Sequence, residues 1–376
     1  MLNQPKFADD IMTLFAQRKA LPVHIPVIQP ADPFLDMAGE DLRRRIFLTE
    51  SETGESLCLR PEFTIPVCLR HIETASGTPQ RYAYLGQVFR QRRDGENEFY
   101  QAGIEDLGDA DIAKADAHAI RDASDTLTAL LPGIELHTTL GDQTVFEAVV
   151  AALGLPDGWQ SRLIHAFGDP ALLDSLLQSL SQASGKVPGI DDNVAALLDS
   201  GDEAGLTELI DRQMVATGYM TNASRTPAEI AHRLVQKARL SNARLDAKAL
   251  DVLKTFLALD TPMRDAADAL AAFSRIAGLD LDAALNIFNA RVQALEKAGF
   301  DLSSSRYRAA FGRPLDYYTG LVFEMSAQGA VLAGGGRFDR LLTLLGAKAA
   351  IPSVGFSLWL DRIAAARAVK SERPSQ

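Results

Sequence analysis

The sequence has little cysteine and no long apolar segment free of charge. Its 376 residues include two cysteines, Cys58 and Cys68, which cannot form a disulfide framework and have no histidine at metal-ligand spacing. No stretch of about 18 uncharged apolar residues could span a bilayer, and the N-terminus lacks the basic and apolar regions of a secretion signal. These absences predict a cytoplasmic protein with reduced cysteines, no bound metal and no membrane contact.

Positive charge is also scarce. The chain has 38 Lys and Arg against 49 Asp and Glu, a net charge of −11 at pH 7. Nucleic-acid binders use Lys and Arg to neutralise phosphates, and here arginine is concentrated only at residues 43–45 and 90–93. An acidic protein can still carry a local basic face, so the composition is only weak evidence against a bound RNA.

The pattern of apolar residues predicts an α+β protein with a helical insertion. Residues 1–156 and 301–376 combine short strand-like segments with amphipathic helices, whereas residues 157–300 keep a helical period of 3.6 residues without a convincing strand. We expect the two sheet-rich parts to form one antiparallel sheet. The predicted elements of the N-terminal part are a helix at 5–20, a hairpin around 51–54, paired strands at 81–90 and 98–107, helices at 111–131 and 142–153, and a strand at 133–140.

The strand predicted at 98–107 carries the first candidate site residues. Alternation along a strand places Gln101 and Glu105 on one face, separated by Gly103. An amide and a carboxylate beside a bare glycine suit a small zwitterion, and Arg90 at the end of the preceding strand could clamp a phosphate or a carboxylate. A strand with one solvated face explains this segment equally simply.

Other candidates are less specific one by one. Glu62 and Thr64 could converge on an ammonium group, or they could be a solvated strand end. Tyr317 and Tyr318 could be ordinary core aromatics. The glycine run at 334–336 permits close approach to a ligand, but such runs are more often turns.

Taken together and in order, the segments LRPEFT, GQVFR, EFYQAGIE, LDYYTGLVFE, AGGGRFDRL and GFSLWLDR resemble those of histidyl-tRNA synthetases. The resemblance covers roughly residues 5–155 and 305–365. It implies the catalytic-core fold of a class II aminoacyl-tRNA synthetase, an antiparallel sheet flanked by helices, and a homodimer.

The resemblance also implies roles for the matching residues. Glu62, Thr64 and Gln101 would hold the α-amino group of histidine. Glu105 and Tyr318 would meet its imidazole. The remaining matches are Tyr317 near the imidazole, Gly335 and Gly336 in the pocket wall, Arg313 at the carboxylate, and Arg90 and Arg362 at the phosphates of ATP.

Three features depart from the synthetase pattern. Only fourteen residues follow Arg362, where a synthetase continues into an anticodon-binding domain of about 100 residues, so we expect no such domain and no tRNA partner. In the synthetases a glutamate closely follows the ATP-phosphate arginine that Arg90 matches, and the loop QRRDGEN lacks this glutamate. Trp359 stands where an open backbone is expected, so the nucleotide half of the site, with Arg90 and Arg362, is interpreted as vestigial.

This combination resembles the regulatory subunits of ATP phosphoribosyltransferase, synthetase-like paralogues that assemble with a short catalytic subunit in histidine biosynthesis. The resemblance implies a non-catalytic subunit without a cofactor, whose partners are that catalytic subunit, a second copy of itself and histidine as a feedback ligand. Because Arg313 is retained, some amino-acid activation by a truncated ligase is the alternative. A third interpretation is a scaffold that binds no ligand.

Overall fold

The computed structural model describes residues 4–37, 39–93, 95–181, 192–216, 226–242, 245–313, 315 and 317–371. The chain divides into two compact units. One, the core unit, comprises residues 1–148, 167–169 and 256–376, and the other, the helical unit, comprises residues 149–166 and 170–255. The helical unit is therefore shorter than the insertion predicted at 157–300, because residues 256–300 return to the core unit and pack there.

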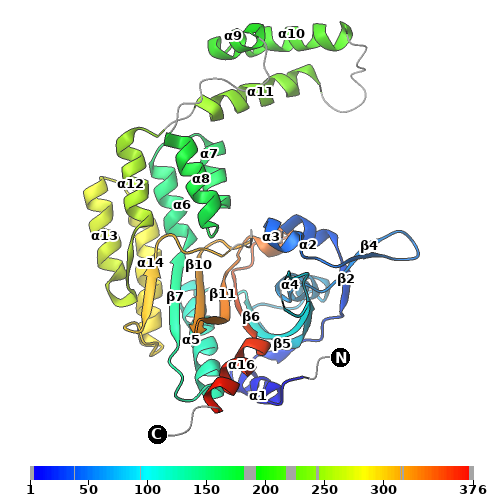
Figure 1. Ribbon diagram of the computed structural model, residues 1–376, viewed down its shortest axis with the longest axis vertical. Coiled ribbons are helices and arrows are strands. Elements are labelled where there is room, and N and C mark those ends of the chain that lie inside the picture. Colours follow the sequence, from blue (N-terminus) through cyan, green and yellow to red (C-terminus); the bar gives the residue numbers. More distant parts are fainter. Residues whose placement is uncertain are drawn as a thin grey trace. The chain divides into compact units, whose positions relative to one another are not determined.

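A nine-stranded sheet organises the core unit (Figure 1). Most neighbouring strands are antiparallel, as predicted, but β1 pairs with β5 and β7 pairs with β9 in parallel. In spatial order the strands are β1 (Leu21–Pro22), β5 (Gln80–Phe89), β6 (Glu98–Leu107), β12 (Ser353–Trp359), β11 (Ala330–Arg337), β10 (Leu321–Ala327), β7 (His137–Asp142), β9 (Ser305–Arg308) and β8 (Asp260–Pro262). The last of these lies within the range predicted to be helical.

A small three-stranded sheet accompanies the large one. Its order is β2 (Ile28–Pro30), β4 (Ser56–Leu59) and β3 (Leu48–Glu50). The antiparallel pair β3 and β4 is the predicted hairpin, with Gly54 at a φ of +85° in the connecting turn. A left-handed φ of this kind is readily adopted only by glycine.

Helices cover the large sheet and connect its strands. In the core unit they are α1 (Ala8–Gln17), α2 (Asp32–Met37), α3 (Gly39–Arg43), α4 (Thr64–Glu73), α5 (Ile112–Leu130), most of α6 (Gln143–Ala152), the short 3-10 helix η1 (Met263–Asp265), α13 (Ala266–Ala277), α14 (Asp282–Lys297), α15 (Leu341–Leu344) and α16 (Leu360–Ser371). Helix α5 packs across β6, β10, β11 and β12, and α14 packs on α5. Helix α15 begins four residues after the end of β11 at Arg337.

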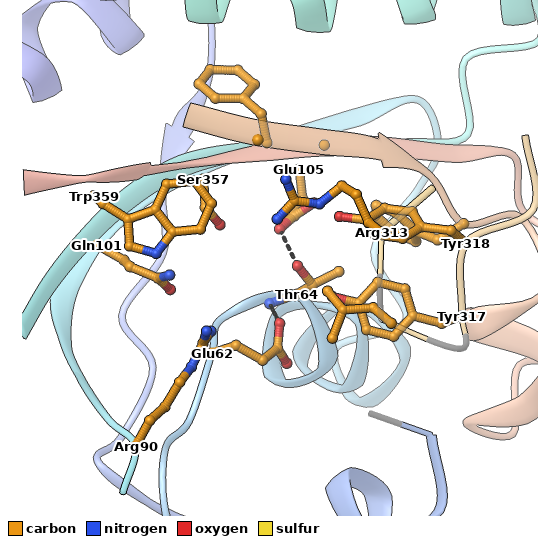
Figure 2. Close-up of a pocket in the computed structure, with 15 residues that line it drawn as sticks. Glu62, Thr64, Arg90, Gln101, Glu105, Arg313, Tyr317, Tyr318, Ser357 and Trp359 are labelled. Carbon is orange, nitrogen blue, oxygen red and sulfur yellow. Dashed lines mark hydrogen bonds between the residues drawn. The ribbon is translucent and has the colours of Figure 1, made fainter. Parts of the chain in front are cut away.

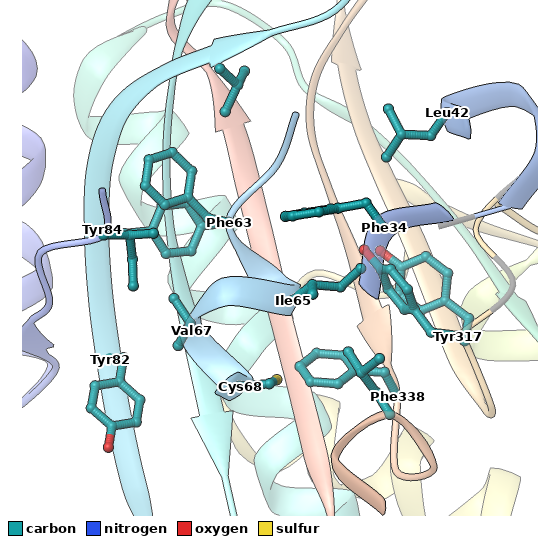
Figure 3. Packing of buried hydrophobic residues seen from close by; sticks show 14 of the residues in the cluster. Phe34, Leu42, Phe63, Ile65, Val67, Cys68, Tyr82, Tyr84, Tyr317 and Phe338 are labelled. Atoms are coloured by element: carbon teal, nitrogen blue, oxygen red, sulfur yellow. The ribbon is translucent and has the colours of Figure 1, made fainter. Parts of the chain in front are cut away.

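The core around α4 is rich in aromatic residues, and it supports the face of the sheet that carries Glu105. The ring of Phe63 stacks on Tyr84 of β5 with centroids 4.4 Å apart. Figure 3 shows Ile65, Val67 and Cys68 packed in the same cluster. Cys58 and Cys68 are both buried free thiols. Burying such side chains contributes about 1.5–3 kcal/mol for each large apolar residue, which fixes α4 against the sheet.

The helical unit contains helices throughout its described residues, as the periodicity predicts. They are the end of α6, α7 (Asp157–His165), α8 (Pro170–Ser181), α9 (Asp192–Ser200), α10 (Glu203–Ala216), α11 (Pro227–Asn242) and most of α12 (Ala247–Leu257). A small apolar core holds α9, α10 and α11 together through Val194, Leu206, Ile210, Ala231 and Val235.

The described part of the chain lacks two kinds of feature, a membrane-spanning helix and a group of metal ligands. No helix there is long and apolar enough to cross a membrane. No group of three or more His, Cys, Asp or Glu side chains there is placed to hold a metal ion.

Candidate functional site

A recess on one face of the large sheet collects most of the predicted site residues (Figure 2). It contains about 420 Å³ of empty space, counted out to its open mouth. Its lining residues are Glu62, Thr64, Arg90, Gln101, Glu105, Arg313, Leu315, Tyr317, Tyr318, Gly334, Phe338, Gly355, Phe356, Ser357 and Trp359.

The register of the sheet explains why these residues meet. In the pairing of β6 with β12, Glu105 lies opposite Gly355 and Gln101 lies opposite Trp359. Because side chains alternate along a strand, residues two apart share a face, so Gln101 and Glu105 both face α4. The predicted alternation along β6 is therefore present in the structure.

Glu105 is the most buried acid of the recess. Its exposed fraction is 1%, and its Oε1 accepts a hydrogen bond of 2.7 Å from the hydroxyl of Thr64. Its Oε2 has no hydrogen-bond partner among the described residues and lies over Gly355, where a Cβ would overlap it. Burial raises the pKa of this carboxyl well above its ordinary value. The Thr64 bond and the nearby Tyr84 hydroxyl oppose the shift, and Glu62 adds to it.

Glu62 supports α4 as well as lining the recess. Its two oxygens accept backbone N–H bonds from Thr64 (2.6 Å) and Ile65 (2.8 Å) in the first turn of the helix. This segment was predicted as a strand end, but it is a helix start, where otherwise unpaired N–H groups attract a carboxylate. Burial raises the pKa of Glu62 despite those two bonds. Each oxygen retains a lone pair for a ligand.

Arg90 and Arg313 bring positive charge to the same recess. Arg90 donates a 2.7 Å bond from Nε to the carbonyl of Pro61, and burial lowers its pKa to about 10 although Glu62 opposes the shift. Arg313 lies over Gly334, where a Cβ would overlap its guanidinium, and it donates a 2.7 Å bond from Nη1 to Glu324. The Nε of Arg313 is buried and has no partner within the described chain.

Two tyrosines form another wall. The ring centroids of Tyr317 and Tyr318 are 5.1 Å apart, and burial raises the pKa of both phenols, so both remain protonated donors at neutral pH. Gly336 lies behind the Tyr318 ring, where a Cβ would be 2.9 Å from two ring atoms. Gly335 pairs with Phe356 and points to the opposite face of the sheet. The glycine that faces the recess is Gly334, one position earlier than predicted.

Arg362 does not line the recess. Its Nη1 donates a 2.8 Å bond to the carbonyl of Val331, and its guanidinium lies 5.1 Å from the centroid of Trp359. The centroid of the same Trp359 ring lies 5.6 Å from the guanidinium of Arg313. Trp359 is therefore close to both arginines. Figure 2 shows its indole projecting toward Ser357 and Gln101.

Sequence patterns alone did not identify several residues of the lining. Ser357 and Gly355 belong to the segment GFSLWLDR, and the pairing of β12 with β6 brings them to the recess. Leu315 and Phe338 lie in the segments LDYYTGLVFE and AGGGRFDRL, but as apolar residues they gave no reason to expect a contact with a ligand. Their signal was only their proximity to the tyrosine and glycine segments.

The recess combines unmet hydrogen-bonding groups of both kinds. Buried and without partners within the described residues are two acceptors, Oε2 of Glu105 and Oε1 of Gln101, and one donor, Nε of Arg313. Buried polar groups are nearly always satisfied in proteins. A ligand that carries N–H groups at one end and a carboxylate at the other would satisfy all three.

Comparison with known proteins identifies the family of the chain. A family model described as histidyl-tRNA synthetase matches residues 8–175 and 166–363. An ATP phosphoribosyltransferase regulatory subunit of Rhizobium johnstonii is 64% identical over 370 residues, covering 98% of this chain and 99% of the relative. Another from Agrobacterium fabrum is 62% identical over 376 residues and covers both chains completely.

Solved structures share the fold. A crystal structure from Bacillus halodurans, described as an ATP phosphoribosyltransferase regulatory subunit/histidyl-tRNA synthetase, superposes with a TM-score of 0.62 at 19% identity, covering 97% of this chain and 83% of that one. A histidyl-tRNA synthetase from Nostoc gives a TM-score of 0.63 at 14% identity, with 99% of this chain and 76% of that one covered. At these identities the likeness establishes the fold.

Proposed function

Because this chain belongs to the family of ATP phosphoribosyltransferase regulatory subunits, which has the class II synthetase-like fold, we propose that it serves the first step of histidine biosynthesis without catalysing it. In this function it assembles with the short-form catalytic subunit, is needed for full activity, and makes that activity sensitive to free histidine. Histidine occupies the recess lined by Glu105, Gln101 and Arg313.

One observation carries this proposal, the set of buried groups without partners. The free Oε2 of Glu105 accepts the imidazole N–H of histidine, with the phenol of Tyr318 nearby. Glu62, Thr64 and Gln101 receive the α-ammonium group. The Nε–H of Arg313, buried and lacking a described partner, donates to the carboxylate. Leaving such groups unpaired costs about 1–3 kcal/mol each, so a ligand that pairs them gains affinity.

The same recess favours a non-catalytic function. Amino-acid activation requires a second substrate, ATP, beside the histidine carboxylate. Trp359 stands on that side of the recess next to Arg313, and Arg362 is bonded to the carbonyl of Val331. The Arg362 guanidinium thus lies against Val331 and Trp359 and does not line the recess.

A histidine-activating ligase is the second candidate, because Arg90 and Arg313 both line the recess. Histidine-dependent exchange of pyrophosphate into ATP separates the two functions. We expect no exchange above a protein-free blank, and exchange that disappears in an Arg313→Ala variant would establish the ligase instead.

The proposal extends to a second copy of the chain as a partner, to the absence of bound tRNA, and to the location of the protein. The protein forms a homodimer, and the small sheet supplies exposed apolar residues for it, since Ile28 and Leu48 are each 57% exposed. It binds no tRNA, in keeping with its acidic charge, and it functions in the cytoplasm, where Cys58 and Cys68 remain reduced.

The deciding experiment is reconstitution with a short-form catalytic subunit. Formation of phosphoribosyl-ATP is measured with and without this chain, and then across a histidine titration. We expect the chain to raise the rate and histidine to suppress it. No complex and no change in rate would contradict the proposal.

Matched variants locate the inhibition in the recess. Glu105→Gln replaces a carboxyl oxygen at the imidazole position with an amide NH2 group, whereas Glu98→Gln makes the same change on β6 outside the recess. We expect Glu105→Gln to assemble normally but to resist histidine by roughly tenfold or more, the equivalent of about 1–3 kcal/mol. If the two variants respond alike to histidine, the scaffold interpretation replaces the sensor.

A further inference from the structure

Three residues of the turn between α7 and α8 belong to the core unit. The segment Phe167–Asp169 packs with the sheet and its loops, although the helices on either side of it, α7 and α8, belong to the helical unit. The chain therefore passes from the helical unit into the core unit and back within a few residues.

This segment contacts the backbone that carries Arg313. Gly168 has a φ of +98°, and a Cβ built on it would lie 2.6 Å from the backbone nitrogen of Arg313 and 2.7 Å from the carbonyl carbon of Gly312. A Cβ on Gly312 would in turn lie 2.6 Å from the nitrogen of Gly168 and 2.7 Å from the ring of Phe167. Real Cβ atoms do not approach other atoms so closely, so both positions require glycine.

Strand β7 confines the same backbone. A Cβ on Gly141 would overlap the carbonyl oxygen of Phe311, two residues before Arg313. The contact with Gly168 and the contact with Gly141 therefore fix the 311–313 backbone at neighbouring positions, and the direction in which the Arg313 side chain leaves it is set by both.

An aromatic stack anchors the segment. The Phe167 ring stacks on Phe146 of α6, with centroids 4.6 Å apart and planes inclined by 18°. Phe146 also stacks against Phe256, at 6.3 Å, and both of these rings are fully buried. Packed interiors transmit displacements rather than absorb them, so a shift of the segment has to move its neighbours.

We propose that Phe167–Asp169 is a positioning element for Arg313 and, through Arg313, for the occupancy of the recess. The segment does not touch the ligand. It sets where the Arg313 guanidinium lies between Glu324, Gly334 and Trp359. The ligand-binding part of this inference rests on the proposed function, whereas the positioning part does not.

The test compares two glycine variants with matched backbone strain. Gly168→Ala introduces a methyl group against the Arg313 backbone. Gly346→Ala is the control, since Gly346 has a φ of +100° and a Cβ there would meet nothing within 4 Å. By calorimetry we expect Gly168→Ala to bind histidine roughly tenfold more weakly than Gly346→Ala, as for a displaced charged hydrogen-bond donor. Equal affinities in folded proteins would contradict the ligand-binding part.

A second readout needs no ligand. The sequence has two tryptophans, Trp159 and Trp359, so 5-fluorotryptophan labelling yields two ¹⁹F signals that a Trp159→Phe variant assigns. Because the Arg313 guanidinium lies 5.6 Å from the Trp359 ring, we expect Gly168→Ala to shift the Trp359 signal and Gly346→Ala to leave it in place. An unshifted Trp359 signal in folded Gly168→Ala would overturn the proposal.

The outcomes remain separable if parts of the experiment fail. A wild-type protein that binds no histidine would refute the proposed function, while the Trp359 signal still decides the positioning. Should Gly168→Ala not fold, Phe167→Leu removes the stack on Phe146 without adding a methyl group at Arg313. It is expected to shift the Trp359 signal too, and an unchanged signal in that variant would overturn the proposal.

Discussion

At the scale of single residues, Glu105 shows a conflict between stability and binding. Its carboxyl is 1% exposed and one of its oxygens has no partner in the described chain. An isolated buried charge is strongly unfavourable, and burial accordingly raises the pKa of Glu105 well above 4.5. A side chain optimised only for folding would be neutral here.

Glu105→Gln should therefore stabilise the ligand-free protein at neutral and alkaline pH. Between the ordinary carboxyl pKa near 4.5 and the raised folded value, the unfolded chain has lost the proton while the folded protein keeps it. Stability contributed by this group thus falls as pH rises through that window. The variant has no titrating group at this position, so its free energy of unfolding does not fall in this way. We expect its free energy of unfolding at pH 8 to exceed that of the wild type by about 1–2 kcal/mol, since one pKa unit equals about 1.4 kcal/mol.

Urea unfolding of both proteins at pH 5 and pH 8 measures this difference. Comparing the wild type with the variant at each pH cancels the titration of groups common to both, including Glu62. A difference in stability that does not grow with pH would contradict the assignment of a raised pKa to Glu105.

Glu62 has a structural duty as well as a binding one. Glu62→Ala removes both acceptors from the first turn of α4, and we expect it to destabilise the protein by about 1–2 kcal/mol and to weaken histidine binding. Asp246→Ala is a matched control, because Asp246 accepts the N–H of Ala249 at the start of α12, far along the chain. Chemical denaturation and calorimetry should show a loss of stability in both variants and a loss of affinity only in Glu62→Ala.

At the scale of secondary-structure elements, a buried ionic network joins two helices and two strands. Asp116 of α5 accepts bonds from Arg291 of α14 (2.7 Å) and Arg337 of β11 (2.8 Å). Arg291 also bonds Asp142 of β7 at 2.5 Å, and Arg337 bonds Asp339 at 2.6 Å. Burial alone would lower the pKa of Arg291, but its two carboxylate partners raise it.

This network also holds the chain that directly follows Tyr317 and Tyr318. The N–H of Thr319 donates a 2.8 Å bond to the carbonyl of Arg337, and the N–H of Asp339 donates to the Thr319 hydroxyl at 3.0 Å. The Tyr317 and Tyr318 wall of the recess is thus fixed at its C-terminal side by β11 and the charges behind it.

Removing the central acid should be severe. Asp116→Ala leaves Arg291 and Arg337 each without one buried partner, and breaking a buried pair from one side costs about 3–5 kcal/mol. Asp260→Ala breaks the pairs with Arg306 and Arg308, which are 39–52% exposed, and should cost at most about 1 kcal/mol. Urea midpoints of the two variants test this ordering, and equal losses would refute the importance of burial.

At the scale of the whole molecule, regulation requires that histidine bind one state of the assembly better than another. A coupling free energy of about 1–3 kcal/mol corresponds to a 5- to 150-fold change in affinity. By reciprocity, assembly with the catalytic subunit changes histidine affinity by the same factor. Under the proposed function, such a difference would reach the sheet through the recess, the wall formed by Tyr317 and Tyr318, and the Phe167–Asp169 segment.

Ligand binding should also stabilise the isolated protein. Histidine at about 100 times its dissociation constant would add about 2.7 kcal/mol, visible as a rise in Tm. Histidinol replaces the carboxylate with an alcohol, so it leaves Arg313 without its anionic partner. We expect histidinol at equal concentration to raise Tm less than histidine, and an equal rise would exclude Arg313 as the carboxylate contact.

Local sequence patterns determined the elements and half of the site. The alternation along β6 sufficed to put Gln101 and Glu105 on one face, because a strand's geometry has a period of two residues. The helical periodicity of residues 157–300 likewise predicted helices without reference to the rest of the chain. The order of the six segments then identified the fold and the family.

Tertiary structure alone decided which neighbours those residues have. Glu62 became a helix-capping group because the chain turns into α4 there, and Gly334 replaced Gly335 in the recess because pairing with β12 sets the register of β11. The helical unit ends at Thr255 rather than at residue 300 because the chain that follows belongs to the core unit, where α14 packs on α5. The contact between Gly168 and Arg313 joins positions far apart in the sequence, and no local periodicity encodes such a meeting, since it depends on how the whole core unit packs.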